Sequence, residues 1–163
     1  MTSTCSAEHS KGVPVISIVI ADRGKADRTA SRRLLEPEKD IRVVGEARSG
    51  LDAVAAAESL KPSIMLLDLS LVDGDSTPLL PVIRRKSPRT RVLLLSNRGP
   101  DSRTLDGLSH GARGYLDKST LGTCLSRAVR VVNAGEAWVP RKMVGKIIDR
   151  LARLTVSGTA SCG

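Results

Sequence analysis

Four polar side chains that could do chemistry together each stand where an apolar run of the sequence ends. They are Asp22 after 15–21, Asp68 after 63–67, Ser96 after 91–95 and Lys118 after 113–116. A carboxylate can act as a nucleophile and form an aspartyl phosphate, and paired acids supply the oxygen ligands that suit Mg²⁺. An ammonium group and a hydroxyl can bind phosphoryl oxygens. Together the four predict phosphoryl transfer to a carboxylate, whereas a single strand-terminal Asp is better explained as a cap.

Apolar and amphipathic runs alternate along the chain, as strands and helices do in α/β proteins. Strands are expected at 15–21, 41–47, 63–68, 91–96 and 113–116, and helices at 25–36, 51–60, 78–86, 100–110 and 119–135. Pro78 and Pro81 predict a late or irregular start for the third helix. Near-continuous apolar strands indicate a parallel sheet covered on both faces. The predicted fold is therefore α/β, a doubly wound five-stranded parallel sheet of flavodoxin-like order 2-1-3-4-5 with an extra C-terminal helix.

This strand order decides whether the four polar groups meet. The first, third, fourth and fifth strands become neighbours, so their carboxyl ends deliver Asp22, Asp68, Ser96 and Lys118 to one edge of the sheet. Open α/β sheets bind their ligands in the crevice outside that edge. Turn-forming residues at 73–76 follow Asp68 and lead into the next helix.

Composition narrows the class of protein. The 163 residues suffice for one domain and a short appendage, and the net charge of +9 favours acidic partners. Only Tyr115 and Trp138 are aromatic, which disfavours a surface that stacks nucleic-acid bases. Cys5, Cys124 and Cys162 lie far apart without a CxxC pair, so we expect no zinc site or disulfide framework, and reduced cytoplasmic thiols. No apolar run approaches the roughly 20 residues that span a bilayer.

The chain divides into four expected segments. Residues 1–12 form a disordered N-terminal tail, 13–135 the main domain, 136–155 a linker and C-terminal amphipathic helix, and 156–163 a flexible tail. The amphipathic helix begins at Pro140. Apolar residues follow one of its sides, at Val144, Ile147, Ile148, Leu151 and Leu154, and lysines and arginines follow the other. We expect the apolar side to pack on its own domain or on a second copy.

Five short motifs resemble the receiver domain of two-component response regulators. They are Ile20–Asp22, Val43–Ala47, Leu66–Leu69, Gly111–Lys118 and Gly135–Trp138. The resemblance runs from about Ile16 to Val132 and is closest to receivers that precede a LuxR-type helix-turn-helix. It implies a cytoplasmic phosphoprotein of a phosphorelay that controls transcription, with a sensor histidine kinase as phosphoryl donor and a homodimer as the assembly. DNA would be contacted only through a C-terminal domain that this chain lacks, and no membrane is implied.

The resemblance also implies a role for each matched residue. Asp68 is the phosphoacceptor, Asp22 and the Ser70 carbonyl hold Mg²⁺ with it, Ser96 is the switch hydroxyl, Tyr115 the switch aromatic and Lys118 the phosphoryl-binding cation. Phosphorylation is then expected to draw Ser96 inward and repack Tyr115. Tyr115 is equally well explained as a half-buried core aromatic.

Three features depart from the family pattern. The family usually has two adjacent acids after the first strand, and Arg23 replaces the second of them here. The loop after Asp68 lacks its usual proline, and Asp117 stands beside Lys118. Loss of one acid weakens the expected Mg²⁺ site, and Arg23 could either pair with Asp68 in place of the metal or point to solvent.

Two other functions compete with a phosphorylation-switched regulator. One is a phosphorylation-independent receiver that acts as a protein-interaction or dimerisation module, with Arg23 replacing the metal. The other is a nucleotide-binding or hydrolytic enzyme. Because no Gly-rich phosphate loop follows the first strand and no Ser-His-Asp set is apparent, we do not expect the chain to be an enzyme.

Overall fold

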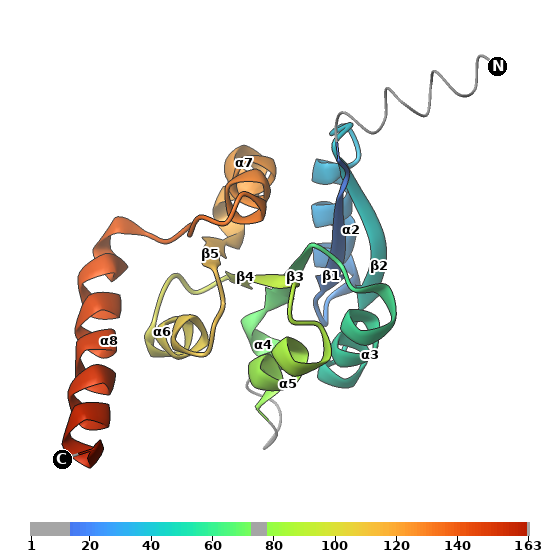
Figure 1. The fold of residues 1–163 in the computed structure, drawn as a ribbon. Coiled ribbons are helices and arrows are strands. Elements are labelled where there is room, and N and C mark those ends of the chain that lie inside the picture. The colour runs from blue at the N-terminus through green and yellow to red at the C-terminus, as the bar shows by residue number, and fades with distance from the viewer. Residues whose placement is uncertain (1–13, 73–77, 163) are drawn as a thin grey trace.

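Five parallel strands form a single sheet in the order β2-β1-β3-β4-β5 (Figure 1). The computed structural model describes residues 14–72 and 78–162, with side chains to residue 154. The strands are β1 (Ile16–Ala21), β2 (Ile41–Ala47), β3 (Ile64–Asp68), β4 (Arg91–Ser96) and β5 (Gly114–Asp117). The predicted fold class and strand order are confirmed, and β1, β3, β4 and β5 lie side by side as the convergence of the polar groups requires.

Helices cover both faces of this sheet. They are α2 (Lys25–Leu35), α3 (Gly50–Leu60), α4 (Leu69–Val72), α5 (Leu79–Lys86), α6 (Ser102–Ser109), α7 (Leu121–Asn133) and α8 (Arg141–Cys162), with a 3₁₀ turn, η1 (Lys118–Thr120), before α7. The buried apolar side chains separate into two clusters, one with residues of α2 and α7 and the other with residues of α3, α4 and α5. Leu66 joins the first and Leu67 the second, because successive strand residues face opposite sides.

Burial on both faces explains why the strands read as apolar runs. All five residues of β3 are buried, and within β4 only Arg91 is partly exposed. The first residues to break the run are therefore those at the carboxyl edge, where helices no longer cover the strand ends. Asp68 and Ser96 are polar at that edge and still buried, at 7% and 4% exposure.

Some boundaries differ from the prediction. The chain turns at once from β3 into α4, a single helical turn that periodicity did not indicate. Helix α5 begins at Leu79, with Pro78 as its N-cap residue, one residue after the expected start at 78. Helix α8 continues to Cys162, so the backbone is helical beyond residue 156, where a flexible tail was expected. The expected tail at 1–12 and the turn at 73–76 lie outside the described residues.

A segment after α7 covers the outer edge of β5. Trp138 accepts a hydrogen bond from the Tyr115 N–H at 2.8 Å and donates one to the Arg113 carbonyl at 3.1 Å. The chain then enters α8, which packs beside α6 (Figure 1). Arg150 of α8 forms an ion pair with Asp106 of α6 at 2.8 Å. None of the helices among the described residues is long and apolar enough to cross a bilayer.

Gly114 permits this close approach of Trp138. A Cβ at position 114 would lie 2.7 Å from the Trp138 carbonyl oxygen and 2.8 Å from Leu93 Cδ1. We therefore expect Gly114→Ala to lower the free energy of unfolding by about 1–3 kcal/mol, the usual cost of overpacking. Urea unfolding measures the change. The control is Gly122→Ala in α7, where a Cβ meets nothing within 4 Å; equal stability of the two variants would contradict the assignment.

Candidate functional site

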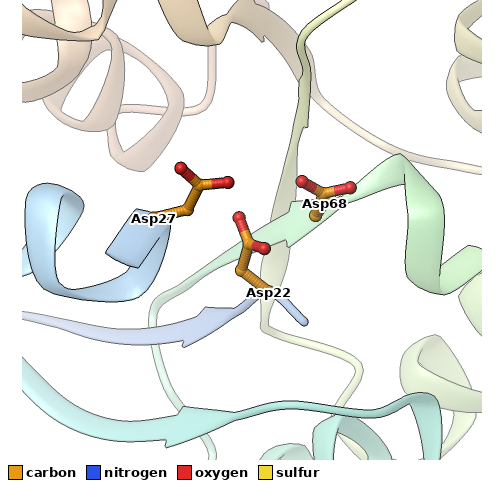
Figure 2. A group of neighbouring side chains, drawn as sticks. All are labelled: Asp22, Asp27 and Asp68. Atoms are coloured by element: carbon orange, nitrogen blue, oxygen red, sulfur yellow. The ribbon is translucent and has the colours of Figure 1, made fainter. Parts of the chain in front are cut away.

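Two buried carboxylates lie at the carboxyl ends of neighbouring strands. Asp68 is the last residue of β3, and Asp22 directly follows β1. They are 7% and 3% exposed. Figure 2 shows both with a third carboxylate, Asp27, from the first turn of α2. One oxygen of each carboxylate lies within 4.8 Å of the others.

Lys118 reaches into this group from the end of β5. Its Nζ donates to Asp22 Oδ2 at 2.6 Å and to Asp27 Oδ2 at 2.8 Å, and it pairs with Asp68 Oδ2 as well. The Lys118 side chain is only 8% exposed. The predicted convergence of Asp22, Asp68 and Lys118 is thus observed, and these three side chains together with Asp27 form the group called the pocket below.

Backbone groups fix the orientation of the two buried carboxylates. Asp22 Oδ1 accepts a hydrogen bond from the Gly24 N–H at 2.9 Å, and Asp68 Oδ1 accepts one from the Ser70 N–H at 2.7 Å. In each residue one oxygen is therefore held by the main chain while Oδ2 faces the ammonium. Both oxygens of Asp68 are thus engaged, Oδ1 by the Ser70 N–H and Oδ2 by the Lys118 ammonium.

The charge state of the pocket follows from burial and from these bonds. Burial disfavours the charged form of Asp68, but hydrogen bonds from Lys118 and Ser70 outweigh it and hold its pKa below the ordinary value. Burial raises the pKa of Asp22, and the neighbouring charge of Asp68 adds to that rise. Burial also opposes the charge on Lys118, yet its carboxylate partners raise its pKa above the ordinary lysine value. An ionised Asp68 therefore faces a protonated Lys118 at neutral pH.

Ser96 and Tyr115 occupy the neighbouring strands. Ser96 ends β4, one residue beyond the partner of Asp68 in the strand register, and its Oγ accepts the Arg98 N–H at 3.1 Å. Tyr115 lies in β5 and is 2% exposed, more deeply buried than the half-buried position expected for a core aromatic. Its hydroxyl makes no hydrogen bond within the part of the chain that the structure describes. Burial raises the pKa of this hydroxyl.

Neither Arg23 nor Asp117 takes part in the ion pairs that join Lys118 to the three carboxylates. Arg23 is exposed, and its side chain forms no ion pair among residues 14–72 and 78–154. Its backbone carbonyl and that of Asp22 accept hydrogen bonds from Arg28. Lys118, not Arg23, pairs with Asp68, so the structure gives no support to the guanidinium as a metal substitute. Asp117 accepts the N–H and hydroxyl of Ser119 and so caps η1.

Asp27 is the site residue that sequence reasoning missed. It lies five residues after Asp22, beyond the strand end on which the prediction concentrated. The available signal was the start of α2 at Lys25, because a first-turn residue of that helix returns to the carboxyl edge of β1. Ser70, whose carbonyl was predicted as a metal ligand, lies in α4, and that role remains a prediction.

The donor set suits a hard cation. Three carboxylates offer oxygen ligands at close range, the chemistry that Mg²⁺ prefers. The Lys118 ammonium already occupies their centre as a cation supplied by the chain itself. Asp22, Asp27 and Asp68 are therefore the side chains that fit the magnesium site implied by the sequence.

Comparison with known proteins identifies the family. A model of the response regulator receiver domain matches residues 18–130. The chain belongs to this family. Response regulator protein VraR of Staphylococcus aureus is 30% identical to this receiver over 138 residues, which cover 85% of the chain and 66% of VraR. The receiver thus spans just under two thirds of that relative.

Solved receiver domains share the fold. The signal receiver domain of the response regulator NarL from Mycobacterium tuberculosis matches with a TM-score of 0.69 and 28% identity, covering 76% of this chain and 99% of that one. A LuxR-family two-component response regulator from Aurantimonas sp. SI85-9A1 matches with a TM-score of 0.73 and 24% identity, over 85% and 99% of the two chains. The receiver is a signalling module of two-component systems, and its relatives include response regulators of the NarL and VraR types.

Proposed function

We propose that this receiver accepts a phosphoryl group on Asp68 and thereby switches an interaction surface that controls transcription. One observation carries the proposal: a buried carboxylate has one oxygen fixed by the Ser70 N–H and the other facing the Lys118 ammonium. A residue that served only as a cap would not need a cation from a strand two positions away. The donor in this account is the phosphohistidine of a sensor histidine kinase.

Each pocket residue has a separate role in phosphoryl transfer. Asp68 Oδ2 attacks phosphorus while the bond from phosphorus to the donor nitrogen breaks, and the leaving imidazole keeps that electron pair and takes a proton. The Lys118 ammonium gives up its contact with Asp68 and binds the phosphoryl oxygens as a point charge. Mg²⁺ held by Asp22, Asp27 and Asp68 would neutralise the charge on those oxygens.

Ser96 and Tyr115 supply the switch in this proposal. The Ser96 Oγ accepts the Arg98 N–H, and in this proposal the hydroxyl turns to donate to a phosphoryl oxygen on the adjacent strand. Tyr115 has a buried hydroxyl without a partner among the described residues, which is a cost that a second arrangement could remove. Repacking these two residues would shift the balance between two positions of α6. The Arg150–Asp106 ion pair would pass this shift on to α8.

A phosphorylation-independent receiver is the second candidate. Lys118 satisfies all three carboxylates without a metal, so one state of the pocket is stable in the unphosphorylated chain. In that case the domain acts as a protein-interaction or dimerisation module. Because Lys118 already pairs with the three carboxylates and Arg23 is exposed, this alternative does not require the Arg23 guanidinium in the site.

Intact-mass measurement separates the two candidates. The wild-type chain is incubated with a small phosphodonor, once with Mg²⁺ and once with a metal chelator. Phosphorylation on Asp68 predicts a gain of one phosphoryl group with Mg²⁺ and a much smaller gain with chelator. No gain in either sample would favour the phosphorylation-independent module.

Helix α8 provides the expected dimer contact. Four of its apolar side chains, Val144, Ile148, Leu151 and Leu154, are 41–59% exposed although they follow one side of the helix. We expect Ile148→Glu combined with Leu151→Glu to weaken self-association, as should deletion from Pro140 onward, because charge replaces apolar surface in the contact. Analytical ultracentrifugation over a range of concentrations measures the association.

The exposed Lys146 offers a matched control for this test on the same helix. Lys146→Glu introduces the same side chain without removing apolar surface, and it should leave the sedimentation behaviour unchanged. An unchanged monomer–dimer balance in the Ile148 and Leu151 double variant would remove α8 from the dimer contact. Any DNA contact in this proposal is made by a separate DNA-binding domain, as in the LuxR branch that the sequence resembles.

A further inference from the structure

We infer that Asp27 is a ligand of the divalent-cation site and replaces the acid that is missing at position 23. This inference rests on the proposed function, because it concerns the metal that assists phosphorylation of Asp68. Its geometric basis is the close approach of one oxygen from each of Asp22, Asp27 and Asp68, all within 4.8 Å of one another. Figure 2 shows the Asp27 carboxylate turned toward the other two, away from its own helix.

The Lys118 ammonium already lies among these three carboxylates. The Lys118 ammonium donates to Asp27 Oδ2 at 2.8 Å and to Asp22 Oδ2 at 2.6 Å. Lys118 therefore shows that positive charge is bound by Asp27 together with the strand-end acids, not by the strand-end acids alone. Hydrogen bonds from a chain ammonium can be exchanged for bonds from a metal ion when Lys118 moves to the phosphoryl group.

The charge count supports a divalent ion. Three acidic side chains share a single ammonium in the pocket, an excess of two acids over the one lysine, and a divalent ion supplies the matching positive charge. Without Asp27 the excess would be one acid. Because Arg23 is exposed and forms no ion pair among the described residues, its positive charge does not enter this count at close range.

The start of α2 keeps Asp27 accessible to a metal. The Asp27 side chain is 47% exposed, whereas those of Asp22 and Asp68 are 4% and 10% exposed. Asp27 thus forms the solvent side of the pocket, where an ion can enter without unfolding the strands. Gly24 lies between the acids: a Cβ there would be 3.5 Å from Asp27 Oδ2 and 3.7 Å from Asp22 Oδ1.

A simpler role for Asp27 is stabilisation of its helix. An acidic residue in the first turn interacts favourably with the helix dipole. Asp52 has this role in α3, where it occupies the same position, three residues after the N-cap residue Ser49. Asp52 is exposed and does not belong to the acidic group, so it separates the helix effect from metal binding.

Isothermal titration of Mg²⁺ into the full chain tests the inference. Asp27→Asn should weaken Mg²⁺ binding by at least about tenfold, since loss of an outer-shell partner alone costs that much. Asp52→Asn should bind like the wild type. Thermal unfolding gives a second readout: Mg²⁺ should raise the midpoint of the wild type and of Asp52→Asn, and raise that of Asp27→Asn much less.

The outcomes distinguish this inference from the proposed function. Wild-type affinity in Asp27→Asn, or an equal loss in Asp52→Asn, would overturn the ligand role of Asp27 while leaving phosphorylation of Asp68 untouched. Absence of Mg²⁺ binding in the wild type would overturn it as well. Failure of the proposed function appears separately, as absence of any phosphoryl gain by mass in a wild type that binds Mg²⁺.

Discussion

Replacement of Asp68 with Asn is expected to abolish phosphoryl uptake from a small phosphodonor while leaving the fold intact. The amide cannot act as the nucleophile, because its nitrogen and oxygen lack the negative charge of the carboxylate. The fold should survive, since an amide oxygen can still accept the Ser70 N–H that Asp68 Oδ1 accepts at 2.7 Å. Intact mass after incubation with phosphodonor and Mg²⁺ measures the effect.

A carboxylate at the same edge of the sheet provides the control for this experiment. Asp117 ends β5 beside Lys118, but it accepts hydrogen bonds from Ser119 and does not pair with the ammonium. Asp117→Asn should therefore take up phosphoryl as the wild type does. Equal uptake by Asp68→Asn and the wild type would show that the acceptor is another residue.

Replacement of Lys118 with Met is expected to lower the free energy of unfolding by about 3 kcal/mol at neutral pH, within the range for breaking a buried ion pair. The change leaves Asp22 and Asp68, which are buried, as uncompensated charges at close range. The methionine fills a similar volume, so the loss is electrostatic and not a cavity effect. Urea unfolding followed by circular dichroism measures it.

The loss should depend on pH in a defined direction. The pKa of Asp68 is lowered in the folded wild type, so its ionised form stabilises the fold above the ordinary value of 3.8, and this contribution is lost as pH falls through the lower folded value. The pKa of Asp22 is raised, so its contribution has the opposite sign. In Lys118→Met the carboxylates lack a cation, and acid should relieve their repulsion as they take up protons. The stability difference from the wild type should therefore shrink as the pH falls toward 3.8.

Two further variants identify the source of this loss. Lys25→Met removes an exposed lysine from the start of α2 and should change the stability by no more than about 0.5 kcal/mol. Adding Asp68→Asn to Lys118→Met removes one of the repelling charges and should recover part of the stability. A pH-independent loss, or no recovery in the double variant, would show that Lys118 matters through packing alone.

The sheet could be predicted from the sequence because its strands are buried on both faces. Continuous runs such as Ile64–Leu67 admit few other placements, and right-handed crossovers limit the strand order. The strand-end residues then followed directly, since Asp22, Asp68 and Ser96 are the first polar residues after such runs. Their convergence with Lys118 needed no information beyond the topology.

Other parts of the site depend on local geometry that periodicity does not encode. Asp27 comes to the pocket because α2 begins so soon after β1, and the direction of its side chain is a property of the first helical turn. The single turn α4 is too short for a periodic pattern. Small and polar residues after Leu154 suggested a tail, yet the helix that begins at Arg141 continues to Cys162.

Arg23 shows why a departure from a motif is hard to interpret from sequence alone. A guanidinium beside Asp22 could equally turn into the pocket or away from it, and its neighbours in the sequence do not decide. In the structure Lys118 already occupies the space beside Asp68, and Arg23 is exposed. The third carboxylate comes instead from Asp27, so the pocket retains three acids in a different arrangement.

Chemical mapping of the phosphorylated residue tests the central claim most directly. Borohydride reduces an acyl phosphate to an alcohol, so a phosphorylated aspartate becomes homoserine and can be located by peptide sequencing. The wild-type chain, treated with phosphodonor and Mg²⁺ and then reduced, should contain homoserine at position 68 alone. Homoserine at position 22, 27 or 117, or at no position, would contradict the assignment of Asp68 as the acceptor.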